Sequence, residues 1–146
     1  MKFWVMAIFS LSERLARLAR RVDKDMESLS VSMTVETVTL FEAMLALEDK
    51  KRRICNFKVF KDLMVDKLKP GELEIVSRYI KGEVLQEIAD DLKISKSTAA
   101  RKFNRAMDVC GKYLVSMTFT EERFLAEYKD IPLIWRTVKQ FGRNAL

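Results

Sequence analysis

The sequence predicts an all-α protein: a helical bundle that contains a helix-turn-helix, with helical N- and C-terminal extensions. Apolar residues recur at steps of three and four along most of the chain, which is the helical period. Only four Gly and two Pro interrupt the 146 residues. A short acidic segment is followed by a turn and a longer basic segment, a sequence pattern of two helices joined at a sharp angle.

The chain begins with a strongly apolar run, "FWVMAIF", from Phe3 to Phe9. It is shorter than the about 20 apolar residues that span a bilayer. It also lacks a small-residue cleavage site before the basic "ERLARLARR". We expect a helix that buries itself against the rest of the protein or a second subunit. An interfacial membrane helix is an alternative, because Trp4 is followed by a basic cluster of Arg14, Arg17, Arg20 and Arg21.

A second helical pattern starts at Ser10 and carries a seam of apolar residues spaced by three and four. The seam consists of Leu11, Leu15, Leu18, Val22, Met26 and Leu29. It suits packing or dimerisation. The segment "SLSVSMTVETV" then alternates Leu29, Val31, Met33 and Val35 with Ser and Thr, which favours an extended connector.

A helix is expected from about Thr34 or Val35 to Arg53, where "KKRR" suits a helix C-terminus. Its apolar side contains Val38, Phe41, Met44, Leu45 and Leu47. Helical spacing then resumes, and Pro70-Gly71 breaks it. The resumed pattern consists of Phe57, Phe60, Leu63, Met64 and Leu68.

Five further helices follow in the second half of the chain. We expect them at about 70–81, 85–91 and 96–115, within "TFTEERFLAEYKD", and from Pro132 onward. These helices suggest three parts. They are an N-terminal packing or dimerisation region over 1–56, a helix-turn-helix domain over 57–116 and a C-terminal helical extension over 117–146.

The composition limits the functions that fit. A total of 27 Lys and Arg against 21 Asp and Glu gives a net charge of +6, which favours an anionic partner. The chain has no His, the commonest general base and metal ligand, and no Gly-rich phosphate loop. Cys55 and Cys110 are far apart, which favours a reduced, cytoplasmic location. We therefore expect a protein that is not an enzyme, with no cofactor and no metal.

The segment from Leu85 to Ser95 has the features of the first helix and turn of a helix-turn-helix. Ala89 is small enough for a helix crossing, and Ile94 can fill the space between the helices. Ser95 is an N-cap by type and position. The apolar stripe is Leu85, Ile88 and Leu92, and the residues expected to face water are Glu87, Asp90 and Asp91.

The second helix has an apolar side and a basic side. Its apolar side contains Ala99, Phe103, Ala106 and either Val109 or Cys110. Its other side presents Lys96, Ser97, Ala100, Arg101, Asn104 and Arg105, with Thr98 and Lys102 flanking. Five basic residues and one acidic residue give Lys96–Lys112 a net charge of +4. Such a face fits the major groove of DNA.

The stretch "LKPGELEIVSRYIKGEVLQEIADDLKISKSTAARKFNRAM" resembles region 4 of the sigma-70-type bacterial transcription initiation factors, over residues of about 68–114. The likeness lies in the Leu-Pro opening, "R-Y-x-x-G", "EIA-x-x-L", "I-S-x-S/G-T" and the closing Arg-Ala. Lys93 stands where that family usually has a turn glycine. The family's other main part is not recognisable in residues 1–67, so the resemblance implies a sigma-like regulator.

The resemblance implies a set of DNA-binding residues. The positions that match its base-contacting residues are Ser97, Thr98, Ala100 and Arg101, and those suited to phosphate contact are Lys96, Lys102 and Arg105. Ala100 stands where a polar or basic residue is common, which directs its contact toward a thymine methyl group.

We therefore expect a sequence-specific DNA-binding transcription regulator that reads the major groove with helix 96–110. Double-stranded DNA is its main expected partner. RNA polymerase and a second copy, bound through the N-terminal helix, are further candidates, and membrane contact is not expected. Two alternatives remain: a protein-interaction module that docks on RNA polymerase or another regulator, and a basic membrane-surface protein.

Overall fold

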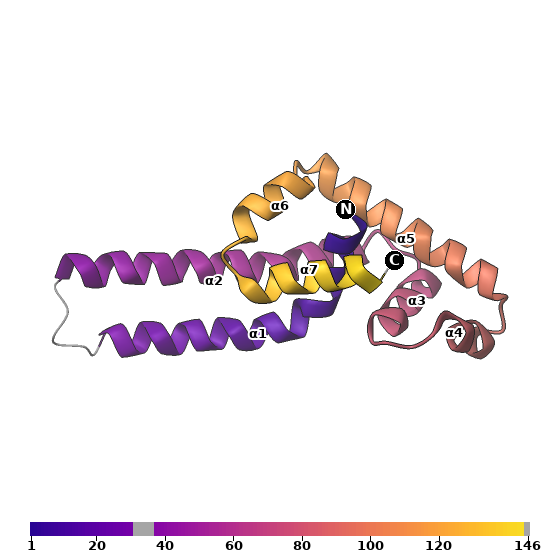
Figure 1. Cartoon of the computed structure of the whole chain (residues 1–146), viewed down its shortest axis with the longest axis horizontal. Coiled ribbons are helices and arrows are strands. Elements are labelled where there is room, and N and C mark those ends of the chain that lie inside the picture. The colour runs from indigo at the N-terminus through magenta and orange to yellow at the C-terminus, as the bar shows by residue number, and fades with distance from the viewer. Residues whose placement is uncertain (31–36, 145–146) are drawn as a thin grey trace. The chain divides into compact units, whose positions relative to one another are not determined.

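The computed structural model describes residues 1–30 and 37–144, and this part of the chain is helical with no strand (Figure 1). The predicted all-α class is therefore confirmed. The helices are α1 (Lys2–Ser30), α2 (Thr37–Val65), α3 (Pro70–Ile80), α4 (Leu85–Leu92), α5 (Lys96–Ser116), α6 (Glu121–Tyr128) and α7 (Pro132–Asn144).

The chain forms two compact units. Met1–Ser10 and Phe60–Leu146 make one unit, which we call the core unit, and Leu11–Val59 make the other, which we call the hairpin unit. Helices α1 and α2 each contribute residues to both. The three parts that the sequence suggests, 1–56, 57–116 and 117–146, stay a prediction.

The hairpin unit pairs the later part of α1 with the earlier part of α2, which run side by side in opposite directions (Figure 1). An ion pair between Asp23 and Lys51, 2.6 Å long, joins the two helices, and this hydrogen bond raises the pKa of Lys51. The predicted seam lies on the helix as expected. Its buried members are Leu11, Leu15 and Val22, and its half-buried members are Leu18, Met26 and Leu29.

Two predicted boundaries in this half of the chain are wrong, because both long helices are continuous. Helix α1 runs unbroken through Ser10, and α2 continues twelve residues beyond Arg53 to Val65. Ile54 and Phe57 are buried, so the apolar pattern carries the helix onward. Arg52 and Arg53 pair with Asp49 at 2.7 and 2.9 Å, so the basic run is matched by acids within the helix.

The predicted connector falls largely on residues 31–36, which lie outside the described residues. These include Val31, Met33 and Val35 and the expected start of the second helix. Leu29, which the sequence places both at the end of the seam and at the start of the connector, belongs to the last turn of α1.

In the core unit, α3, α4 and α5 pack their apolar sides together. The ring of Tyr79 lies 4.6 Å from the ring of Phe103, centroid to centroid, and joins α3 to α5. Ala89 is fully buried, as a residue at a close approach of helices must be. The other fully or nearly fully buried side chains here are Ile75, Val76, Ile88, Ala99, Phe103 and Ala106.

The apolar start of α1 is also part of the core unit. Trp4 is only 5% exposed and stacks on Phe124 of α6 at 5.1 Å. The burial predicted for this run is observed, and the residues concerned are Trp4, Val5, Met6, Ala7, Ile8 and Phe9. Trp4 is thus not free to anchor the protein in a membrane interface. Within the described ranges, we find no helix with both the length and the apolar character needed to cross a membrane.

The first turn of α1 lies between α5 and α7. A Cβ atom placed on Gly111 of α5 would stand 3.2 Å from the Cβ of Met1, and one placed on Gly142 of α7 would stand 3.8 Å from the ring of Phe3. Both helices therefore lie against the same short segment within the core unit.

Candidate nucleic-acid interface

A turn of three residues, Lys93 to Ser95, joins α4 to α5. Lys93 adopts the left-handed conformation, with φ 57° and ψ 41°. The N–H of Ile94 donates to the carbonyl of Ala89 at 3.0 Å, and that of Lys93 donates to the carbonyl of Asp90 at 3.2 Å. These two bonds form a Schellman motif, which satisfies the last carbonyls of the helix. Lys93 is therefore accommodated at the position where the sigma region 4 pattern usually has glycine.

Ser95 caps the N-terminus of α5, as its position predicts. Its Oγ accepts a hydrogen bond from the backbone N–H of Thr98 at 3.1 Å and donates to Thr98 Oγ1 at 2.7 Å. The Oγ of Ser97 lies 3.1 Å from the same hydroxyl. Three hydroxyl groups thus meet at the positive end of a helix dipole.

Helix α5 separates into a buried and an exposed side. Of the two alternatives for its last inward position, Cys110 is buried and Val109 is half-buried. The exposed residues on its first three turns are Lys96, Ser97, Arg101, Asn104 and Arg105. The half-buried residues that flank them are Thr98, Ala100 and Lys102. The structure thus brings all seven sequence-predicted DNA-binding residues together at one end of one helix.

The first part of α5 carries an excess of positive charge, and three of its four cations have no acidic partner among the described residues. Lys96–Met107 contains four basic residues and no acidic residue. Among the described residues, no ion pair involves Lys96, Arg101 or Lys102. These three cations are therefore available to an anionic partner.

Arg105 differs from the other cations because it has an internal partner. Its guanidinium forms an ion pair with Glu72 of α3, whose side chain is 5% exposed. The second carboxylate oxygen of Glu72 has no hydrogen-bond partner among the described residues. Burial, together with this carboxylate, raises the pKa of Cys110 to about 12. Arg105 thus ties α3 to α5, a role that sequence reasoning missed because the two residues are 33 positions apart.

Arg78 holds α4 in place relative to α3. Its guanidinium donates to both carboxylate oxygens of Glu83 at 2.8 and 2.9 Å and also pairs with Asp91 of α4. The hydrogen bonds from Arg78 lower the pKa of Glu83, and the two carboxylates raise the pKa of Arg78. The sequence pattern contained Arg78 only as part of "R-Y-x-x-G", and the acids that it binds lie outside that pattern.

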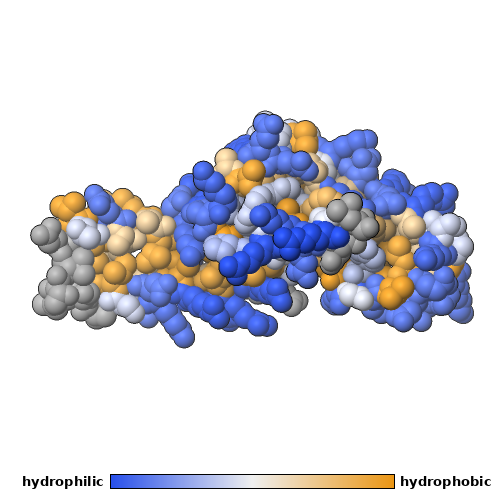
Figure 2. Space-filling view, in the orientation of Figure 1, coloured by the Kyte–Doolittle hydropathy of each residue, from blue (hydrophilic) through white to orange (hydrophobic). Residues whose placement is uncertain are grey.

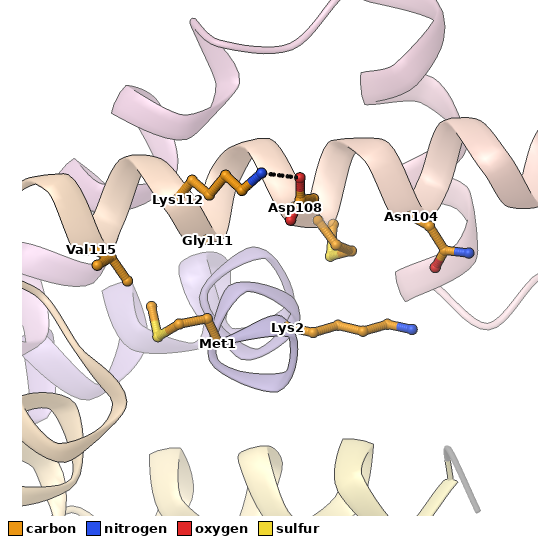
Figure 3. Close-up of a pocket in the computed structure, with 8 residues that line it drawn as sticks. Met1, Lys2, Asn104, Asp108, Gly111, Lys112 and Val115 are labelled. Carbon is orange, nitrogen blue, oxygen red and sulfur yellow. Dashed lines mark ion pairs between the residues drawn. The ribbon is translucent and has the colours of Figure 1, made fainter.

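A cavity of about 440 Å³ lies beside the later part of α5 (Figure 3). Met1 and Lys2 form one wall, and the ion pair between Asp108 and Lys112, 3.0 Å long, lies along the helix above them. The other lining residues are Asn104, Met107, Gly111 and Val115. None of the sequence-predicted site residues lines it. The unpaired cations of α5 are therefore confined to its N-terminal half.

No family model, curated protein or solved structure matches this chain. The resemblance to sigma region 4 therefore stays a prediction from the residues that carry it. Within residues 1–30 and 37–144, no three Cys, Asp or Glu side chains gather in a way that could hold a metal ion.

Proposed function

We propose that α4, the turn and α5 act as a helix-turn-helix, and that the N-terminal half of α5 enters the major groove of duplex DNA. The protein is then a sequence-specific regulator of transcription. One observation carries the proposal: a capped helix N-terminus projects Ser97 and Arg101 outward from a twelve-residue segment with four cations and no acid.

The proposed roles follow from position on the helix. Ser97 and Arg101 lie at the middle of the exposed side, where base edges are within reach of a helix in the groove. Lys96 and Lys102 lie at the margins of that side, which suits the phosphates on either side of the groove. Arg105 and Tyr79 support the proposal because they join the presenting helix α5 to α3, and specific recognition requires such a fixed helix.

The test is selection of binding sites from a pool of random duplex DNA, followed by the salt dependence of binding to the selected site. Arg101→Ala with Lys102→Ala should weaken that binding more than about tenfold, because one base contact and one phosphate contact are lost. The matched control is Arg52→Ala with Lys58→Ala, which removes the same charge from exposed positions of α2. It should leave the affinity within about twofold.

Thermal unfolding of each variant checks that its fold is intact. Equal affinity of the wild-type protein and the Arg101 and Lys102 variant would overturn the proposal. Steep salt dependence without enrichment of any sequence would contradict sequence-specific reading, since phosphate contacts alone give that result.

A second function, self-association through the hairpin unit, is supported by one apolar stripe. Val38, Phe41 and Leu45 are 68, 63 and 53% exposed and lie at helical spacing on α2. The seam on α1 that first suggested a dimer has its residues Leu11 and Leu15 buried within the chain. We therefore propose α2 as the surface that binds a second copy, with RNA polymerase as the competing occupant.

A further inference from the structure

Helix α7 has a polar side whose charges are all positive. Its sequence, "PLIWRTVKQFGRN", contains three basic residues and no acidic residue. The exposed side chains recur at steps of three and four and are Arg136, Lys139, Gln140 and Arg143. The buried side chains lie on the opposite side and are Ile134, Thr137 and Val138. The sequence predicts a helix here, and the protein-interaction alternative uses it as a docking surface.

The three cations have no acidic partner in the part of the chain that the structure describes. Among the described residues, no ion pair involves Arg136, Lys139 or Arg143. Lys139 lies over the ring of Trp135, with Nζ 4.4 Å from the ring centroid, which holds its charge close to the helix. Figure 2 shows strongly hydrophilic side chains over the helix that Figure 1 labels α7.

The apolar side of α7 is not available for insertion into a membrane. A basic amphipathic helix binds a bilayer by inserting its apolar side beneath the headgroups. In α7 that side is already packed in the protein, since Ile134 is fully buried and Val138 is 9% exposed. Binding through α7 would therefore depend on charge alone, which is the way proteins bind nucleic-acid phosphates.

The geometry of α7 matches a phosphate backbone. Arg136 and Arg143 are seven residues apart, which is about 10 Å along a helix axis. Successive phosphates of one DNA strand rise about 3.4 Å along the duplex axis, so this span covers about three of them. The helix also belongs to the same compact unit as α5, and the first turn of α1 contacts both.

We propose that α7 is a second DNA-contacting surface, which binds the phosphate backbone of the duplex outside the site that α5 reads. This inference rests on the proposed function of α5. Helix α7 then adds affinity but no sequence specificity, because phosphates are the same at every base pair.

The experiment measures DNA binding by a double variant, Arg136→Gln together with Arg143→Gln, and by the wild-type protein. Both proteins are tested on the selected duplex and on a random duplex. Lys139 is kept so that its contact with Trp135 is unchanged. Two lost phosphate contacts should reduce the slope of log K against log salt concentration by about 2, equally on both duplexes. Affinity at 0.1 M salt should fall about tenfold or more, while the ratio of specific to random binding stays the same.

The control is Arg52→Gln with Lys58→Gln, which removes the same net charge from α2 and should leave the slope unchanged. If the wild-type protein binds DNA and the α7 variant keeps its slope, the inference is wrong and the proposed function of α5 stands. If the wild-type protein fails to bind either duplex, both are wrong. Loss of binding to anionic phospholipid vesicles, with DNA binding retained, would instead assign α7 to a membrane.

Discussion

Arg105 forms one contact inside the protein and is also a candidate for a phosphate contact with DNA. It lies on the basic side of α5, where it matches a phosphate-contacting position, and it also neutralises the buried carboxylate of Glu72. A carboxylate that loses its only ionic partner while buried destabilises the folded state. The residue therefore contributes to stability, whether or not it also contacts DNA.

We expect Arg105→Ala to lower the free energy of unfolding by about 1–3 kcal/mol, measured by urea denaturation. The guanidinium is 54% exposed, so the effect should be smaller than that of a fully buried pair. Arg101→Ala is the control, because Arg101 is exposed and should change stability by less than about 0.5 kcal/mol. Adding Glu72→Gln to Arg105→Ala should recover part of the loss. If Arg105→Ala unfolds with the same free energy as the wild-type protein, the pair of Arg105 with Glu72 does not stabilise the packing of α3 on α5.

At the scale of elements, the turn between α4 and α5 carries a local conformational cost. Lys93 has a left-handed backbone, which is unfavourable for any residue with a Cβ atom. We expect Lys93→Gly to raise the free energy of unfolding by about 1 kcal/mol and the melting temperature by a few degrees. Thermal unfolding followed by circular dichroism measures it.

The matched control is Lys81→Gly at the end of α3. Lys81 has a right-handed backbone, with φ −73° and ψ −5°, so glycine brings no relief there and only loosens the unfolded chain. It should lower stability by about 0.5–1 kcal/mol. If Lys93→Gly and Lys81→Gly change the free energy of unfolding in the same direction, the left-handed backbone of Lys93 does not carry the expected cost.

Local signals predicted the elements between Pro70 and Ser116 well. Proline opens α3, Ser95 caps α5, and the apolar spacing gives their inward sides. The end of α2 was misplaced because "KKRR" resembles a helix terminus, and only Asp49 and the distant Asp23 reveal that it lies within a helix. The pairs with Asp49 are local, whereas the pair of Lys51 with Asp23 depends on which helices become neighbours, and the local sequence does not contain that information.

The same distinction applies to the candidate site. The exposed side of α5 followed from periodicity, and all its predicted residues lie together. The pair of Arg105 with Glu72 and the pair of Arg78 with Asp91 were missed, because each joins residues of different helices. Glu83 lies only five residues after Arg78, but it stands outside the recognised pattern. The basic side of α7 was visible in its composition. That this basic side is exposed follows only from the fold, in which the apolar side of α7 is buried.

At the scale of the whole molecule, the hairpin unit leaves one side of α2 uncovered. Half-buried residues such as Leu40 and Leu47 lie on one side of this helix, and the exposed stripe of Val38, Phe41 and Leu45 lies on another. Helices that are apolar on two sides are usually covered by more than one neighbour. The described residues of the hairpin unit, 11–30 and 37–59, contain parts of two helices, so a further partner would complete it.

Charge favours a second copy as that partner. Glu42 and Glu48 are exposed on α2 near the stripe, and the exposed charged residues of α1 between positions 14 and 24 are all basic. These cations are Arg14, Arg17, Arg20, Arg21 and Lys24. Two copies that pack their α2 stripes together could therefore place the acids of one near the cations of the other, and each charge would gain a partner.

We expect the wild-type protein to sediment as a dimer, and Phe41→Glu with Leu45→Glu to raise the dimer dissociation constant about 100-fold or more. Burying Phe or Leu side chains contributes about 1.5–3 kcal/mol each, and the new charges would repel Glu42 and Glu48. The control is Val115→Glu with Leu125→Glu, which alters exposed apolar residues of the core unit and should leave the dimer intact. Analytical ultracentrifugation over a range of concentrations measures both. A wild-type protein that stays monomeric at about 100 μM would contradict self-association, since a specific dimer of this kind should form well below that concentration.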